Sequence, residues 1–378
     1  MGVTVNLKRL GTVPIFSQRK WDCPPSERQS RRRAFTLVEL LMVVAIIGIL
    51  IGLITAAAIA ARTAAKRAAI RVEINELDAA VEQYKSEKGE YPPDFAGIGP
   101  STNPKNNADL SLVGIQAVAR HLRKVFPRYW GLDPNPTTTW NHFAADLSAC
   151  GLDATKFDPA TALVFWLGGL PEQAGELPAG FHSDPARPFR YGSPRTGRLF
   201  DFNKDRLVFS VQDGPGGTFR YLRYYPPYLE TPYVYFRARK EQLTPAAGLF
   251  GSGRYDYGTV DRNNSVFTPL VYCHDLASPS NACVPYLDTS PVSASSPVAN
   301  PTLPTADRPW RNREKFQIII AGADNLLDLS VAASTQDLPF LCSRSGQAYL
   351  GGALVPWSAA NMDNQTNFAQ GTLEDELQ

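Results

Sequence analysis

An uncharged run of 22 residues near the N-terminus constrains this chain more than any other feature. The run extends from Leu40 to Ala61 and consists mostly of Leu, Ile, Val and Ala. A helix of that length, at about 1.5 Å per residue, spans the roughly 30 Å hydrocarbon core of a bilayer. One acid, Glu39, stands at the edge of the run. Because an acid at a membrane span is costly, Glu39 is predicted to be functional.

The residues before and inside this run resemble the N-terminal signal of type IV prepilins and type II secretion pseudopilins. The resemblance rests on the basic residues Arg31–Arg33, on Ala34, and on the sequence FTLVE from Phe35 to Glu39. It implies that a prepilin peptidase cuts between Ala34 and Phe35 and that the new N-terminus at Phe35 is methylated. It also implies that Glu39, the fifth mature residue, helps to recruit the subunit into a filament. Ala34 departs from the pattern, because the family nearly always has Gly before the cut.

The helical pattern continues beyond the apolar run. Apolar residues recur at spacings of four and three, which predicts a buried stripe; they are Ile70, Ile74, Leu77, Val81 and Tyr84. Charged residues, among them Glu73 and Glu76, are expected on the other faces. Gly89 and the pair Pro92-Pro93 are expected to end the helix. The segment VEQYKSEKGEYPPD is similar to the end of the long helix in major pseudopilins, so the resemblance extends to about residue 94.

The chain after this helix is predicted to form an α+β, pilin-like head. Helices are expected over residues 107–125 and 158–167. Strands rich in β-branched and aromatic residues, separated by short turns, indicate an antiparallel sheet; they cover residues 207–211, 218–225, 233–237, 266–272 and 316–321. The predicted division is a cleaved leader (1–34), a transmembrane half-helix (35–61), an exported half-helix (62–89), a globular head with large loops (90–360) and a mobile acidic tail (361–378).

The charge of the chain excludes some classes of protein. The leader carries eight basic and two acidic side chains, so the mature chain keeps 30 basic and 34 acidic ones. A mature chain of net charge about −4 is unlike a nucleic-acid-binding protein, which usually carries a basic stripe. Basic residues on the two sides of the apolar run nearly balance, so charge does not set the orientation. The resemblance implies a single-pass inner-membrane protein with a cytoplasmic leader and an exported head, in the periplasm or at the cell surface.

Five cysteines are present, and four of them follow the membrane segment. An even number of exported cysteines suits an oxidising compartment and up to two disulfides. Cys273 and Cys283 flank a loop rich in Ser, Pro and Asn, so they are the favoured bridge. The alternative is that all four are buried thiols.

Two acidic segments are candidate calcium sites. Some major pseudopilins hold calcium in a loop near the C-terminus, and here Asp324, Asn325 and Asp328 follow a strand and offer oxygen ligands. Asp201, Asn203 and Asp205 alternate but lack the Gly and the closing Glu of an EF-hand loop. Asp and Asn of this kind are more often turn residues than ligands. Calcium at the Asp324 loop is therefore the one candidate cofactor.

Catalysis is not expected. The four histidines lie far apart, and neither GxSxG nor HExxH occurs. The aromatic segment Tyr221–Phe236 is either an exposed recognition surface or part of the core, and core packing is favoured.

The predicted function is that of a pilin-like structural subunit. It would be processed by prepilin peptidase and assembled through its N-terminal helix into a type II secretion pseudopilus or a type IV pilus. Its partners would be other subunits, the peptidase and an inner-membrane assembly platform. The alternative is an uncleaved, membrane-anchored binding protein with an exposed aromatic-rich head, in which Ala34 is not accepted for cleavage.

Overall fold

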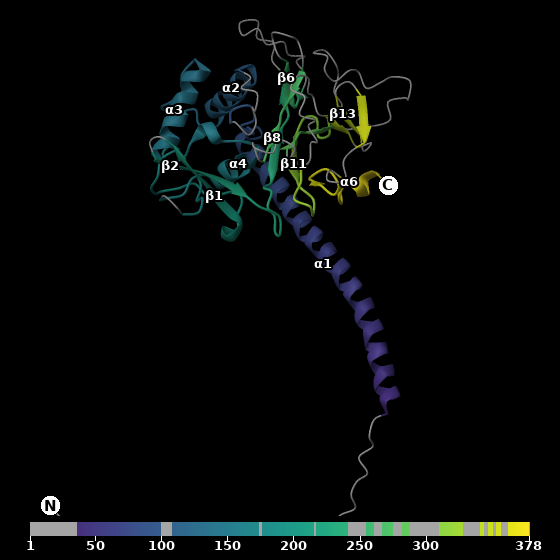
Figure 1. Cartoon of the computed structure of the whole chain (residues 1–378). Coiled ribbons are helices and arrows are strands. Elements are labelled where there is room, and N and C mark those ends of the chain that lie inside the picture. Colours follow the sequence, from purple (N-terminus) through teal and green to yellow (C-terminus); the bar gives the residue numbers. More distant parts are fainter. Residues whose placement is uncertain are drawn as a thin grey trace, which may run out of the picture. The chain divides into compact units, whose positions relative to one another are not determined.

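The structure of the chain is a computed structural model that consists of two compact units, Met1–Ile59 and Ala60–Gln378 (Figure 1). It describes residues 36–99, 108–173, 176–214, 217–240, 255–260, 267–274, 282–287, 310–327, 341–343, 347–350, 353–356 and 362–377. The N-terminal unit contains the first part of one long helix. The C-terminal unit contains the rest of that helix and all the other elements, which combine helices and strands. The predicted α+β class is confirmed.

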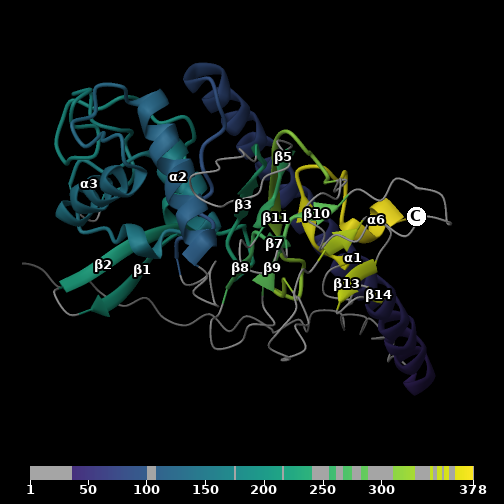
Figure 2. The same ribbon diagram turned by 90° about the horizontal axis from the view of Figure 1, so that it is seen from above.

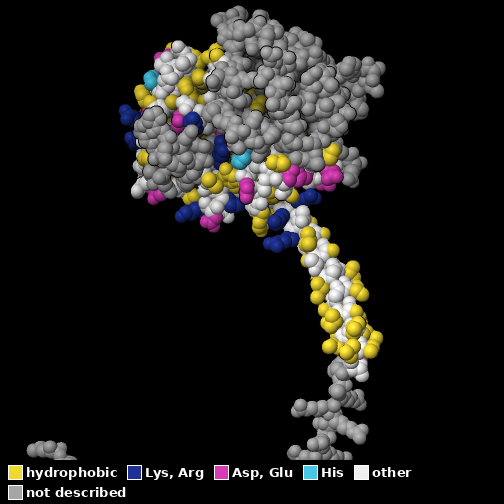
Figure 3. All heavy atoms as spheres, viewed as in Figure 1, with side chains coloured by type: hydrophobic (Ala, Val, Ile, Leu, Met, Phe, Trp, Pro, Cys, Tyr) yellow, Lys and Arg dark blue, Asp and Glu magenta, His cyan; other side chains and the backbone are white. Residues whose placement is uncertain are grey.

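Helix α1 runs from Leu37 to Lys88 over 52 residues. In the N-terminal unit its apolar side chains are exposed to solvent (Figure 3), and among the described residues it is the one helix whose length and composition suit a membrane span. In the C-terminal unit the predicted stripe is buried, with Ile74, Leu77 and Val81 fully enclosed. Gly89 ends the helix with a left-handed φ of 80°, a conformation that glycine adopts readily. The long N-terminal helix is therefore confirmed.

The remaining helices of the C-terminal unit are short. They are α2 (Ala108–Val125), α3 (Pro136–Ala149), α4 (Pro159–Leu163), which continues as the single π-turn η2 (Val164–Gly168), the 3₁₀ turns η1 (Ala154–Lys156) and η3 (Lys204–Arg206), and α6 (Leu373–Leu377). Helix α2 packs against α3. Asp158 caps α4 by accepting from the backbone of Ala160 and Thr161, and Pro159 occupies the first helical position. The helices predicted over 107–125 and 158–167 are present.

The strands form small sheets. Their bounds are β1 (Leu207–Gly214), β2 (Gly217–Tyr224), β3 (Val234–Arg237), β4 (Arg239–Lys240), β5 (Tyr255–Asp256), β6 (Gly258–Val260), β7 (Phe267–Pro269), β8 (Tyr272–Cys273), β9 (Ala282–Cys283), β10 (Tyr286–Leu287), β11 (Phe316–Ile320), β12 (Leu341–Ser343), β13 (Gln347–Leu350), β14 (Ala353–Pro356) and β15 (Gln365–Thr366). The order β15-β11-β3 makes an antiparallel sheet at the centre of the unit (Figure 2), and β1 pairs with β2 as a hairpin. Pairing is antiparallel throughout the described strands, except that β10 runs parallel to β12. The strand predicted over 266–272 is instead the two strands β7 and β8.

The core is unusually aromatic. Trp166 is 2 % exposed, and it stacks on Phe95 with ring centroids 5.6 Å apart. Tyr233, Tyr235 and Phe236, from the aromatic segment that allowed two interpretations, are fully buried, as is most of Tyr224. Large flat rings that meet edge-to-face fill volume and add to the stability gained from burial. The part of the aromatic segment whose side chains the structure describes therefore belongs mainly to the core.

The C-terminal segment differs from the mobile acidic tail that its composition suggested. Strand β15 pairs with β11, so this segment is the edge of the central sheet. Thr366 and Ala369 are fully buried, and Leu373 is 4 % exposed. In α6, Glu374 and Asp375 are exposed, whereas the preceding Leu373 packs into the core.

Candidate functional sites along the N-terminal helix

The start of α1 is a capping box built by Thr36 and Glu39. The carboxylate Oε2 of Glu39 accepts hydrogen bonds from the backbone N–H and the hydroxyl of Thr36, each 3.0 Å long. In return, the Thr36 hydroxyl oxygen accepts from the backbone N–H of Glu39 at 3.2 Å. This pairing satisfies backbone donors that have no partner inside the helix. Glu39 thus has a structural role in its own chain, besides any role toward another subunit. The cleavage and methylation residues Ala34 and Phe35 lie outside the described residues.

A buried carboxylate on α1 forms the main polar link between this helix and the rest of the C-terminal unit. Glu73 is 8 % exposed, and both of its oxygens accept hydrogen bonds from the Arg206 guanidinium, one of them at 2.6 Å. The hydroxyls of Tyr224 and Tyr233 donate to the same carboxylate, each at 2.5 Å. We call these four residues the Glu73 cluster. It joins α1 to η3 and β2 and to the residue before β3, so it fixes where the helix lies on the unit.

The cluster perturbs the acidity of its members. Burial raises the pKa of Tyr233 far above the usual value for tyrosine, and the charge of Glu73 raises it further. The pKa of Tyr224 rises for the same two reasons. Burial opposes the charge of Arg206, but the hydrogen bonds and charge of Glu73 outweigh it and raise the pKa of Arg206. The two tyrosines therefore stay protonated and act as hydrogen-bond donors to the Glu73 carboxylate.

A second polar group lies at the C-terminal end of α1. His121 of α2 is fully buried, with Nε2 2.7 Å from the Tyr84 hydroxyl and Nδ1 2.5 Å from a Glu90 oxygen. Burial lowers the pKa of His121 to about 4, an effect that the bond to Glu90 only partly offsets. Burial raises the pKa of Glu90, but the His121 bond and the Arg237 charge overcome this and bring it to about 2. His121 is thus neutral: its Nδ1–H donates to the Glu90 carboxylate, and its Nε2 accepts from Tyr84.

The C-terminal segment also holds α1. Asn367 donates from Nδ2 to Asp78 of α1 at 2.7 Å, and its own Oδ1 accepts from the backbone N–H of Ile318 in β11. Two residues before Glu73, Arg71 donates to the backbone carbonyl of Thr366 at 2.5 Å. These contacts connect the helix to the outer strand β15 and, through Asn367, to the middle strand β11. They explain why this part of the chain is ordered.

The predicted calcium loop forms a turn. Asp324 Oδ1 accepts from the backbone N–H of Leu326 at 2.9 Å, and Asn325 Oδ1 accepts from that of Glu230 at 2.7 Å. Asn325 adopts a left-handed φ of 60°, which asparagine tolerates in turns. Asp328 lies outside the described residues. In the part of the chain that the structure describes, no three His, Cys, Asp or Glu side chains gather as metal ligands would. Calcium at this loop stays a prediction.

The second acidic segment has structural partners. Asn203 caps the 3₁₀ turn η3 by accepting from the backbone N–H of Asp205, and Asp201 pairs with Arg198 at 2.7 Å. The side chains of Asn203 and Asp201 thus serve turn and surface interactions, as the turn interpretation predicted.

The predicted Cys273–Cys283 bridge is not formed. The ladder between β8 and β9 places Tyr272 opposite Cys283 and Cys273 opposite Ala282. The two cysteines are therefore offset by one position, and in a strand a shift of one residue exchanges the two faces. Cys283 and Cys150 are both buried as thiols. The composition of the loop suggested the bridge, but loop composition does not determine the register in which β8 and β9 pair.

Neither the Glu73 cluster nor the Glu39 capping box was predicted from the sequence. A signal for the box was present, because Thr36-x-x-Glu39 before an apolar run is the usual pattern for one. No local signal marked Glu73, which precedes Arg206 by 133 positions. Its neighbours Glu76 and Glu82 look the same in sequence.

Comparison with known proteins identifies the N-terminal segment. A family model described as the prokaryotic N-terminal methylation motif matches residues 29–55. No curated protein and no solved structure matches the chain. The chain therefore carries the prepilin-type cleavage and methylation motif that its sequence predicted, and this motif supports a subunit of the type IV pilin or pseudopilin type. The motif and the one apolar helix fit a single-pass protein anchored in the inner membrane.

Proposed function

We propose that this protein is a non-enzymatic structural subunit that prepilin peptidase cleaves before Phe35 and that assembles through its N-terminal helix into a type II secretion pseudopilus or a type IV pilus. The methylation motif over residues 29–55 is the observation that carries the proposal. The assembly partners are other subunits and an inner-membrane platform. The C-terminal unit is exported to the periplasm or the cell surface.

The apolar half of α1 supports assembly through helix contacts. Its side chains are exposed along the whole candidate span, including Leu40, Ile49 and Leu53, each more than 60 % accessible. A helix so apolar on all faces needs lipid or other helices around it. A filament core made of such helices supplies that environment after the subunit leaves the bilayer.

The Glu73 cluster supports a mechanical role for the C-terminal unit in the filament. A subunit that is pulled from the membrane by its helix must keep the helix and the head together. The bidentate contact between Arg206 and Glu73, with two tyrosine hydroxyls on the same carboxylate, ties the helix to three separate segments. Bidentate guanidinium–carboxylate pairs fix orientation as well as distance, which suits a rigid joint.

Glu39 is proposed to pair with the amine of a processed Phe35, on its own or a neighbouring subunit. Both charges stand at the edge of an apolar segment, and pairing removes much of the cost of burying them. The capping box complicates the test, because a change at Glu39 also removes a cap. Two variants separate the roles. Glu39→Gln keeps an oxygen for the Thr36 N–H but loses the charge, whereas Thr36→Ala loses the cap partner and keeps the charge.

The test compares these variants in the native host. Glu39→Gln should insert into the membrane normally but enter the sheared filament fraction at least about tenfold less, because breaking a buried pair costs about 3–5 kcal/mol. Thr36→Ala should assemble at close to the unmodified level, since losing a cap costs about 1 kcal/mol. Equal incorporation of Glu39→Gln and the unmodified chain would remove the assembly role of Glu39.

A further inference from the structure

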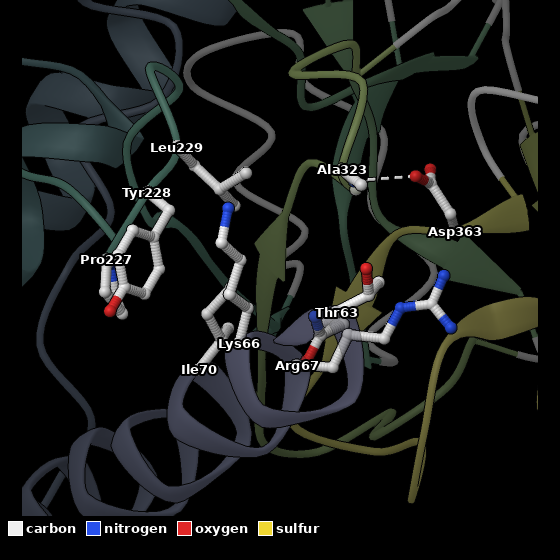
Figure 4. Close-up of a pocket in the computed structure, with 11 residues that line it drawn as sticks. Thr63, Lys66, Arg67, Ile70, Pro227, Tyr228, Leu229, Ala323 and Asp363 are labelled. Atoms are coloured by element: carbon white, nitrogen blue, oxygen red, sulfur yellow. Dashed lines mark hydrogen bonds between the residues drawn. The ribbon is translucent and has the colours of Figure 1, made fainter. Parts of the chain in front are cut away.

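A pocket in the C-terminal unit lies beside the first turns that α1 contributes to it. Side chains of α1 form its floor, the loop Pro227–Leu229 forms one wall, and Ala323 and Asp363 form the opposite wall (Figure 4). Lys66 and Arg67 of α1 point to different sides of this pocket: Lys66 toward Tyr228 and Leu229, and Arg67 toward the side of Asp363. The pocket therefore has a basic side, which carries Lys66, and a side of mixed charge, which carries Arg67 and Asp363.

The two sides differ in how their charges are balanced. On the mixed side, Arg67 lies near enough to Asp363 and Asp375 to act on both carboxylates. Asp363 in turn accepts from the backbone N–H of Ala323 at 2.6 Å. On the basic side, Lys66 lies over the Tyr228 ring, with Nζ 4.7 Å from the ring centroid. Among the described residues, no carboxylate lies within ion-pair distance of Lys66 or Arg62. Within the described part of the chain, Lys66 therefore contacts an aromatic ring rather than a carboxylate.

Tyr228 is held in place at an energetic cost. Its side chain is 69 % exposed and its backbone φ is 71°, a left-handed conformation that bulky residues seldom adopt. Such strain persists only where the surrounding structure enforces it, and here two prolines, Pro226 and Pro227, precede the residue. The result is an exposed phenol ring fixed above a lysine. Tyr is enriched where proteins meet the headgroup layer of a membrane.

The position of this surface along α1 matches a headgroup layer. The uncharged run ends at Ala61, and Arg62 is the next residue. At about 1.5 Å per residue, Lys66 lies about 8 Å beyond the end of that run. The polar layer of a bilayer occupies roughly 5–8 Å on each side of the hydrocarbon core. Figure 3 shows Lys and Arg side chains around these turns, with Asp and Glu side chains beside them on the C-terminal unit. Basic residues on the exported side oppose the usual topological bias, so their presence calls for a reason.

We propose that Arg62, Lys66 and Tyr228 bind the phosphate headgroups of anionic phospholipids in the outer leaflet of the inner membrane. The inference rests on the proposed function only in requiring that α1 spans the membrane and that the C-terminal unit is exported. The two cations attract the phosphodiester, and the phenol provides a hydroxyl and an amphipathic ring at the same depth. Lipid bound in this way would orient the C-terminal unit on the membrane before the subunit enters a filament.

The test measures lipid preference around the membrane-inserted full chain. The chain is reconstituted in phosphatidylcholine bilayers that contain spin-labelled phosphatidylglycerol or spin-labelled phosphatidylcholine, and the motionally restricted fraction of each label is compared. Arg62→Gln, Lys66→Gln and the double variant are measured beside Lys88→Gln. Lys88 is the matched control, because it lies on the same helix about 33 Å farther from the apolar run.

The expected result is a preference for phosphatidylglycerol that falls about fivefold for each basic residue removed near the surface. The control variant should keep the preference. Raising the salt concentration should weaken it as the Debye length shortens from about 8 Å toward 3 Å. A double variant with an unchanged lipid preference overturns the inference. If that variant keeps its lipid preference but loses filament incorporation, the basic residues dock on an acidic face of another subunit, and the lipid proposal is wrong. Either failure leaves the Glu39 test of assembly untouched.

Discussion

Replacing Glu73 by Gln should destabilise the C-terminal unit by about 3 kcal/mol. The substitution removes the charge that Arg206 and two tyrosine hydroxyls share, while the amide oxygen can still accept one of their hydrogen bonds. Removing one partner of a buried ion pair costs about 3–5 kcal/mol. The lower end applies because the Arg206 side chain is 23 % exposed and regains some hydration. Against a typical total of about 5–15 kcal/mol, that is a large share of the stability.

The assay is equilibrium denaturation of the detergent-solubilised full chain, followed by tryptophan fluorescence. Trp140 and Trp166 are buried in the C-terminal unit and report on its unfolding. Glu76→Gln is the matched control, because Glu76 lies three residues farther along the same helix and is exposed. Its effect should stay within about 0.5 kcal/mol. Equal stabilities of the Glu73→Gln and Glu76→Gln chains would show that the contacts of Glu73 do not stabilise the unit.

A double-mutant cycle separates pairing from packing in this cluster. Glu73→Met and Arg206→Met each leave a buried polar partner unmatched, so each should destabilise strongly. The double variant should be less destabilised than the sum of the two, by about 1–3 kcal/mol. Additive effects would show that the two side chains do not stabilise the fold as a pair.

Two further predictions concern the ends of the fold. Burial holds the pKa of His121 at about 4 in the folded chain, against about 6.5 when unfolded, so the unfolded state gains its proton first as the pH falls. Stability is therefore full above about pH 6.5 and should fall by up to about 1.4 kcal/mol per pH unit below it, until about pH 4. Denaturation of the unmodified chain and of His121→Gln at pH 7, 6 and 5 checks this, and an equal slope in both would contradict it. Removing residues 362–378 deletes β15 and the buried Ala369 and Leu373, and should cost at least about 3 kcal/mol, measured by the same denaturation. Removing only the last two residues is the control, and a 362–378 deletion as stable as that control would restore the mobile-tail interpretation.

Periodicity and composition were enough to predict the backbone of this fold in outline. The stripe from Ile70 to Tyr84 has one helical period and one dominant face, so burial follows directly from spacing. Strand β11 contains a run of three Ile residues, and it is fully buried at the centre of the sheet. Helix α3 was not predicted, because its three threonines and its Asn-Pro start look like a turn. Asn135 as N-cap and Pro136 at the first helical position were nevertheless available signals.

Long-range pairing accounts for what the sequence could not show. Glu73 was expected on a solvent-facing side of the helix, and only its contact with Arg206 makes it a buried anchor. The tail was expected to be mobile because Glu374, Asp375 and Glu376 dominate its composition. Its order depends on β15 meeting β11 and on Asn367 meeting Asp78, which are partners far away in the chain. The cysteine prediction failed for the same reason, since one step of strand register decides it.

The most direct test of the account is the intact mass and N-terminal peptide of the protein purified from its native membrane. The account predicts a chain that begins at N-methylated Phe35, with the residues up to Ala34 removed. Such a chain has Glu39 at its fifth position, as assembly requires. A chain that keeps residues 1–34 would contradict processing and would favour a membrane-anchored binding protein instead.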